Sequence, residues 1–109
     1  MVMKYGEALE NAISAIEKSI LPRCKHFKIG KTGQLLHTRF VQSAYKNEYK
    51  HIRLLGRCCS VSAASKLEAD LIEKYILCSK CDNIKSGRVS FKDSMASEDG
   101  KYRVYIVWE

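Results

Sequence analysis

The run from Tyr102 to Trp108 constrains the fold of this chain most. It reads Tyr-Arg-Val-Tyr-Ile-Val-Trp, and β-branched and aromatic side chains of this kind fit the pleated surface of a sheet. The sequence therefore predicts a strand here. Because one strand cannot bury its own faces, other strands and helices of the 109 residues must complete the domain.

Three helices are predicted from apolar residues that recur at three- and four-residue steps. The first has its apolar stripe at Leu9, Ala12, Ile13, Ile16 and Ile20 and ends before Pro22, because the residue preceding a proline avoids the helical region. The second is capped by Thr32 or Gly33. Its buried stripe consists of Leu36, Phe40, Ala44 and Tyr45. The third opens at Ser60 or Ser62, and its stripe consists of Ala64, Leu67, Leu71, Ile72 and Tyr75.

Two further strands are predicted from short runs that glycine interrupts. Residues 24–29 form one strand, which enters a turn at Gly30, and residues 49–55 form another, which Gly56 ends. The expected fold is therefore α+β, with a small antiparallel sheet flanked by about three helices in a single domain over residues 1–109.

Positive charge is concentrated in the first half of the chain. The net charge is +7, and the segment 23–57 holds nine lysine and arginine residues against one acidic residue, Glu48. Such a segment favours a polyanionic partner, because each neutralised phosphate releases counterions. The alternative is a solvated basic face that has no partner.

Composition also bears on the compartment. No run approaches the roughly 20 apolar residues that a membrane span needs, and residues 1–10 lack a secretory signal pattern. The cysteine count is five, and Cys58 and Cys59 are adjacent, which suits free thiols better than a disulfide framework. We therefore expect no membrane partner and a reducing intracellular compartment, the cytoplasm or the nucleus.

Glu68 lies at the edge of the apolar stripe of the third predicted helix. A carboxylate in that position needs a cation, a metal or hydrogen-bond donors, since its desolvation costs several kcal/mol. It is therefore either a ligand of a hard metal such as Mg²⁺ or a boundary glutamate whose carboxylate reaches solvent or pairs with a lysine.

A series of short motifs, taken in order, resembles the GIY-YIG nuclease superfamily. The motifs are residues 28–32 (Lys-Ile-Gly-Lys-Thr), Arg39, residues 64–72 and Asn83, and the resemblance is to the variant with Lys-Ile-Gly in the second motif. The resemblance implies a DNA endonuclease that hydrolyses phosphodiester bonds with one divalent ion, Mg²⁺ or Mn²⁺.

The resemblance also implies roles for individual residues. Glu68 matches the metal ligand, Arg39 the arginine that stabilises the phosphate, and Asn83 the asparagine that orders the site. Lys28 stands where a tyrosine is usual and is expected to contact phosphate. These roles are chemically reasonable, because a guanidinium binds phosphate through a fixed fork of donors and a metal polarises the phosphoryl group.

The chain departs from this family in its first motif, because no Gly-Ile-Tyr strand precedes Lys28. Two explanations remain open. The chain is a catalytically inactive nucleic-acid-binding module, or its C-terminal strand replaces the missing one by circular permutation. The second explanation brings Tyr105, or else Tyr102, into the site as a general base.

Two further hypotheses concern partners and metals. DNA is expected to contact the basic side chains Lys25, Lys31, Lys50 and Arg53. A basic domain that docks an acidic protein is the alternative from a different functional class. Cys78 and Cys81 have the spacing of a zinc knuckle, but a single pair is a weak signal, so zinc is not expected.

Overall fold

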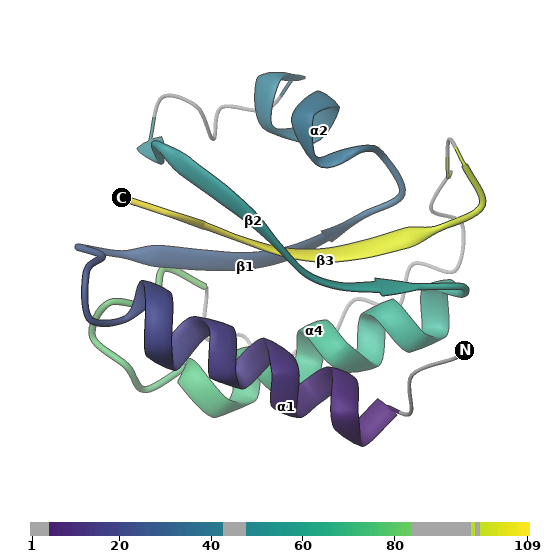
Figure 1. The fold of residues 1–109 in the computed structure, drawn as a ribbon. Helices are drawn as coiled ribbons and strands as arrows, with labels where there is room; N and C mark the ends of the chain where they lie inside the picture. Colours follow the sequence, from purple (N-terminus) through teal and green to yellow (C-terminus); the bar gives the residue numbers. More distant parts are fainter. Residues whose placement is uncertain (1–4, 43–47, 84–96, 98) are drawn as a thin grey trace.

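The computed structural model describes residues 5–42, 48–83, 97 and 99–109. Within these ranges the chain forms a three-stranded antiparallel sheet with helices on both faces (Figure 1). Helix α2 (Leu36–Gln42) covers one face, and helices α1 (Tyr5–Ala15) and α4 (Val61–Tyr75) cover the other. This arrangement confirms the expected small α+β fold. No helix in the described ranges is both long and apolar enough to cross a membrane.

The C-terminal strand is the central strand of the sheet. β3 (Tyr102–Trp108) lies between β1 (Phe27–Thr32) and β2 (His51–Cys58) and runs antiparallel to both. The prediction for this strand is confirmed at both ends. Its residues 104–107 are at most 1% exposed, because helices cover both faces of the sheet.

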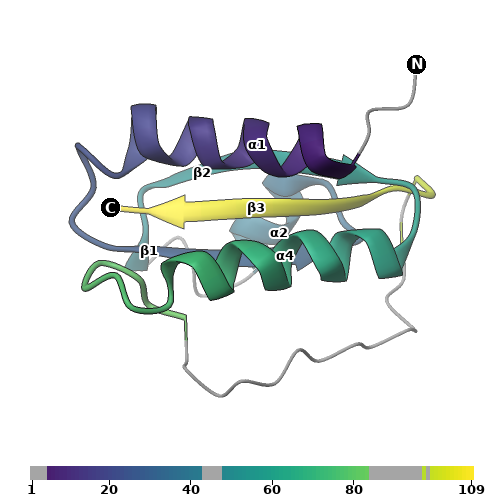
Figure 2. The same ribbon diagram turned by 90° about the horizontal axis from the view of Figure 1, so that it is seen from below.

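The two long helices lie side by side beneath the sheet. Figure 2 shows α1 along β2 and α4 along β1, with β3 between them. α1 continues as a π-helical turn (η1, Ile16–Ile20) and the chain leaves the helix before Pro22, as predicted. Ser60 caps α4, since its hydroxyl oxygen accepts a hydrogen bond of 3.1 Å from the Ala63 N–H. The predicted stripe of α4 faces the core, with Leu67 and Leu71 fully buried.

The predicted ends of β1 and β2 are wrong, because both strands continue through their glycines. Gly30 lies opposite Tyr105 in the ladder, and the Tyr105 ring packs where a side chain on Gly30 would be. Gly56 has the same function on β2, where the side chain of Leu67 packs against its backbone. Both glycines therefore permit close approach and do not form turns. Next to Gly56, a β-bulge turns the Leu55 side chain into the core between the sheet and helices α1 and α4.

Helix α2 also begins later than predicted. Thr32 is the last residue of β1, and its hydroxyl accepts a 3.0 Å hydrogen bond from the Gln34 N–H, so it shapes the turn instead of capping the helix. Leu36 and Phe40 pack on the sheet as expected. Ala44 and Tyr45 lie outside the described residues.

The contact between Gly30 and Tyr105 predicts the effect of a substitution. A Cβ atom on Gly30 would lie 2.5 Å from the Tyr105 hydroxyl oxygen, so Gly30→Ala is expected to destabilise the fold by about 1–3 kcal/mol. Urea unfolding measures this change. Gly6→Ala is the control, because no atom lies within 4 Å of a Cβ there. Equal free energies of unfolding for Gly30→Ala and the parent would contradict the packing.

Candidate active site at the edge of strand β1

The segment after α4 returns to the outer edge of β1. The Phe27 N–H donates to the Lys80 carbonyl at 2.8 Å, and the Asp82 N–H donates to the Phe27 carbonyl at 2.7 Å. The side chain of Asn83 then pairs with Ile29 like a strand residue, accepting from its N–H and donating to its carbonyl, both at 2.9 Å. Asn83 thus fixes the edge of β1 immediately before Gly30.

A buried polar cluster lies on the α4 side of this edge. The Lys31 ammonium donates to the Ser65 hydroxyl at 2.7 Å and lies 3.8 Å from a Glu68 carboxylate oxygen. The side chains of Lys31 and Glu68 are only 9% and 18% exposed. Burial raises the pKa of Glu68, and the positive charge of Lys31 partly offsets that rise. A lysine therefore pairs with Glu68, which is one of the arrangements expected for this carboxylate.

Tyr105 lies on the opposite side of the sheet, beneath α2. Residues paired across a ladder share a face, so Tyr105 faces the same way as Gly30, and Lys31 faces α4. Tyr105 is 1% exposed and packs with Tyr49 and Val107. The sheet therefore separates Tyr105 from Glu68, and the Tyr105 hydroxyl lies over Gly30 of β1.

The register also distinguishes the two tyrosines considered for the site. Tyr102 pairs with Cys58, and its partly buried side chain packs against the core between the sheet and helices α1 and α4. It is three positions from Tyr105, so the two rings lie on opposite faces. Tyr105 is therefore the tyrosine that lies over the Lys-Ile-Gly segment.

The remaining predicted catalytic residues belong to the α2 side. Lys28 is half-buried in β1 and paired with Val107, so it shares its face with Tyr105. The backbone of Arg39 lies in α2, while its side chain lies outside the described part of the chain.

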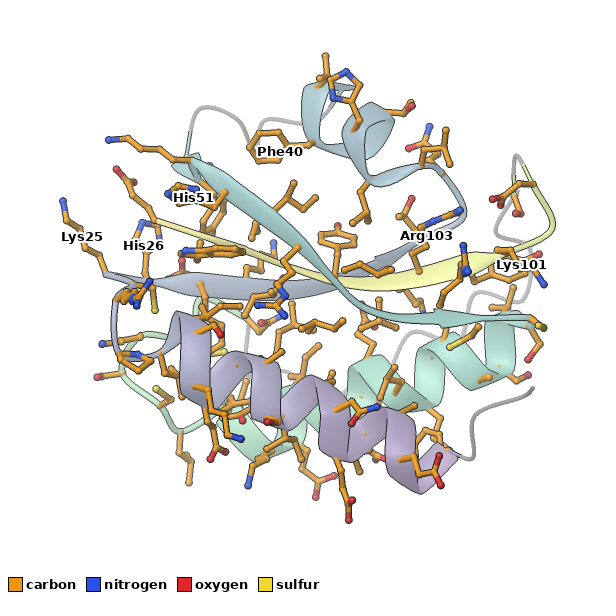
Figure 3. All side chains as sticks on the ribbon, viewed as in Figure 1. Lys25, His26, Phe40, His51, Lys101 and Arg103 are labelled. Atoms are coloured by element: carbon orange, nitrogen blue, oxygen red, sulfur yellow. The ribbon has the colours of Figure 1, made fainter. Side chains whose placement is uncertain are left out.

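The predicted DNA-contacting residues occupy different surroundings. Lys25, Lys50 and Arg53 are exposed, and the Lys50 side chain is 74% exposed with its ammonium 3.5 Å from the Glu109 carboxylate. Lys31 differs, since it points inward to Ser65 and Glu68. Figure 3 shows Lys25 at the end of the sheet where β3 finishes.

The donor atoms around Glu68 limit the kind of metal site. A Mg²⁺ ion commonly takes one protein carboxylate and completes its shell with water and phosphate oxygens. Within the described residues, no group of three or more His, Cys, Asp or Glu side chains converges on a metal position. The cation that the structure places beside the Glu68 carboxylate is the Lys31 ammonium.

Cys78 and Cys81 follow α4, and all five cysteines are free thiols.

Sequence reasoning missed a polar clamp that holds the segment carrying Asn83. His26 Nδ1 bonds to the Asp82 carboxylate, and the Tyr49 hydroxyl donates to the same oxygen at 2.7 Å. His26 Nε2 lies 3.5 Å from Glu109. His26 and Asp82 are 56 positions apart, so no local pattern marks them as partners.

Comparisons with known proteins add no family assignment. No protein-family model, curated protein or solved structure matches the chain.

The clamp predicts a pH dependence of stability. The hydrogen bond to Asp82 raises the pKa of His26 above its ordinary value of 6.5. The stabilisation is therefore complete below pH 6.5 and lost as the pH rises through the folded pKa. Urea unfolding across this range is expected to show the loss in the parent and not in His26→Gln. His37→Gln, at an exposed position in α2, is the control and should retain the loss. A similar decline in His26→Gln would refute the clamp.

Proposed function

We propose that this chain is a metal-dependent DNA endonuclease whose site lies at the outer edge of β1. The observation that carries the proposal is the position of β3, antiparallel to β1, with the Tyr105 hydroxyl over Gly30. The resemblance to GIY-YIG nucleases implies a strand that carries a tyrosine and lies beside the strand that carries Lys-Ile-Gly. In this chain β3, from the C-terminal part of the sequence, carries Tyr105 and pairs with β1.

In this proposal, each residue of the site has its own role in phosphodiester hydrolysis. A divalent ion at Glu68 would polarise the phosphoryl group and stabilise the leaving oxygen. Arg39 holds the phosphate through its guanidinium fork, and Lys28 contributes a second positive charge. Asn83 keeps the edge of β1 in place by pairing with Ile29.

Tyr105 is the proposed general base. Because the Tyr105 side chain is 1% exposed and lies across the sheet from Glu68, this role requires that the packing around Tyr105 open to admit the attacking water and the phosphate. A positioned base of this kind typically contributes 10²–10⁴-fold to the rate.

The exposed cations Lys25, Lys50 and Arg53 supply non-specific affinity for the DNA backbone through counterion release. The five free thiols support action in a reducing compartment.

A specific observation favours a second candidate, a non-catalytic nucleic-acid-binding module. The Lys31 ammonium lies 3.8 Å from Glu68, where a metal ion would otherwise compensate the carboxylate charge. In this candidate Lys31 replaces the ion permanently, and the basic surface binds DNA without cleaving it.

Nicking of supercoiled plasmid with Mg²⁺ or Mn²⁺ tests the proposal. Glu68→Gln and Arg39→Ala are each expected to slow nicking on the order of 100-fold or more, because each removes a group that stabilises charge in the transition state. Glu73→Gln is the matched control, an exposed glutamate on the same helix, and it should cleave like the parent.

The outcomes separate the two candidates. Nicking that EDTA abolishes and that depends on Glu68 and Arg39 supports the nuclease. An inactive parent whose salt-sensitive DNA binding persists in Glu68→Gln supports the binding module. Glu68→Gln that nicks at the parent rate would overturn the assignment of the site.

A further inference from the structure

Two lysines bracket the end of the central strand. The Lys25 N–H donates to the Glu109 carbonyl on the β1 side, and the Lys50 N–H donates to the Trp108 carbonyl at 3.1 Å on the β2 side. Both side chains are exposed. Figure 3 shows Lys25 and His51 at this same end of the sheet. Positive charge therefore lies on both sides of the last residues of β3.

An aromatic stack lies between these charges. His51 pairs with Trp108 across β2 and β3, and their rings stack with centroids 5.1 Å apart and planes inclined by 25°. Trp108 is half-buried against the core, whereas His51 is exposed. Two positions along β2, Arg53 is exposed on the same face as His51. An exposed ring backed by a second ring, with cations around it, is the arrangement that binds nucleobases.

We propose that this sheet-end platform, formed by Lys25, Lys50, His51, Arg53 and Trp108, binds an unpaired base of single-stranded nucleic acid. The base stacks on His51 and extends the stack with Trp108, while the flanking phosphates contact the cations. In a duplex each base face is covered by its neighbours, so the platform selects single-stranded or unpaired segments. The inference rests on the proposed nucleic-acid partner; the platform shares Lys25, Lys50 and Arg53 with the proposed contacts to the DNA backbone and contains none of the proposed catalytic residues.

The acidic groups described near the platform are already paired. The Glu109 carboxylate lies 3.5 Å from the Lys50 ammonium and 3.5 Å from His26 Nε2. Asp82 is bonded to His26 and to the Tyr49 hydroxyl. Their negative charge is therefore largely compensated, and in the described part of the chain a phosphate that reaches Lys50 competes with the Glu109 carboxylate for its ammonium.

Binding of labelled oligonucleotides tests the platform. The probes are an oligothymidine of about 15 nucleotides and a hairpin duplex of similar length, both in EDTA so that no cleavage occurs. Trp108 is the only tryptophan in the chain, so its emission reports directly on the platform. We expect the single strand to bind more tightly than the duplex and to change the Trp108 emission.

Substitutions at His51 separate stacking from charge. Loss of the ring in His51→Ala is expected to weaken oligothymidine binding by about 5- to 100-fold with little effect on the duplex. His51→Tyr keeps an aromatic face and should retain binding. His37→Ala, at an exposed position on α2, is the control and should bind like the parent.

The same measurements on Glu68→Gln separate this inference from the nuclease proposal. If the nicking assay fails and oligothymidine binding still depends on His51, the platform stands without the nuclease. Equal binding of single strand and duplex, an unchanged Trp108 emission, or unaltered affinity in His51→Ala would each overturn the platform, as would absence of binding to both probes.

Discussion

The fold depends on the pairing of β3 with two strands at once. β1 and β2 each hydrogen-bond to β3, which alone joins them within the sheet. Its side chains alternate, with Val104 and Ile106 in the core under α1 and α4 and with Tyr105 and Val107 in the cluster under α2. Burial of each such side chain contributes about 1.5–3 kcal/mol, so β3 stabilises both layers of the domain.

The same pairing shapes the candidate site. Opposite Tyr105, β1 has a glycine, so the tyrosine ring can pack against the strand where a side chain would otherwise lie. One residue later Lys31 faces α4 and compensates the buried charge of Glu68. A buried ion pair of this kind contributes little net stability, but loss of either partner is costly.

The sequence predicted correctly those features that depend on residues close together along the chain. The β-branched run at 102–108, the apolar stripe of α4 and the Ser60 cap depend on neighbours within a few residues, and all three are confirmed. The edge position of Glu68 followed from helical spacing and agrees with its partial burial.

The features that were missed depend on distant residues. Gly30 and Gly56 were interpreted as strand ends, because their role in close packing depends on Tyr105 and Leu67. The contact of His26 with Asp82 joins residues that the sequence keeps far apart. The sequence predicted Tyr105, with Tyr102 as the alternative, and the strand register adds that Tyr105 is the one opposite Gly30.

The most direct test of the account is single-turnover DNA cleavage by Tyr105→Phe and Tyr102→Phe. Each substitution removes one hydroxyl and keeps the ring, and the two tyrosines lie on opposite faces of the same strand. The account predicts that Tyr105→Phe slows cleavage on the order of 100-fold and that Tyr102→Phe cleaves like the parent. Cleavage by Tyr105→Phe at the parent rate would contradict the assignment of Tyr105 as general base.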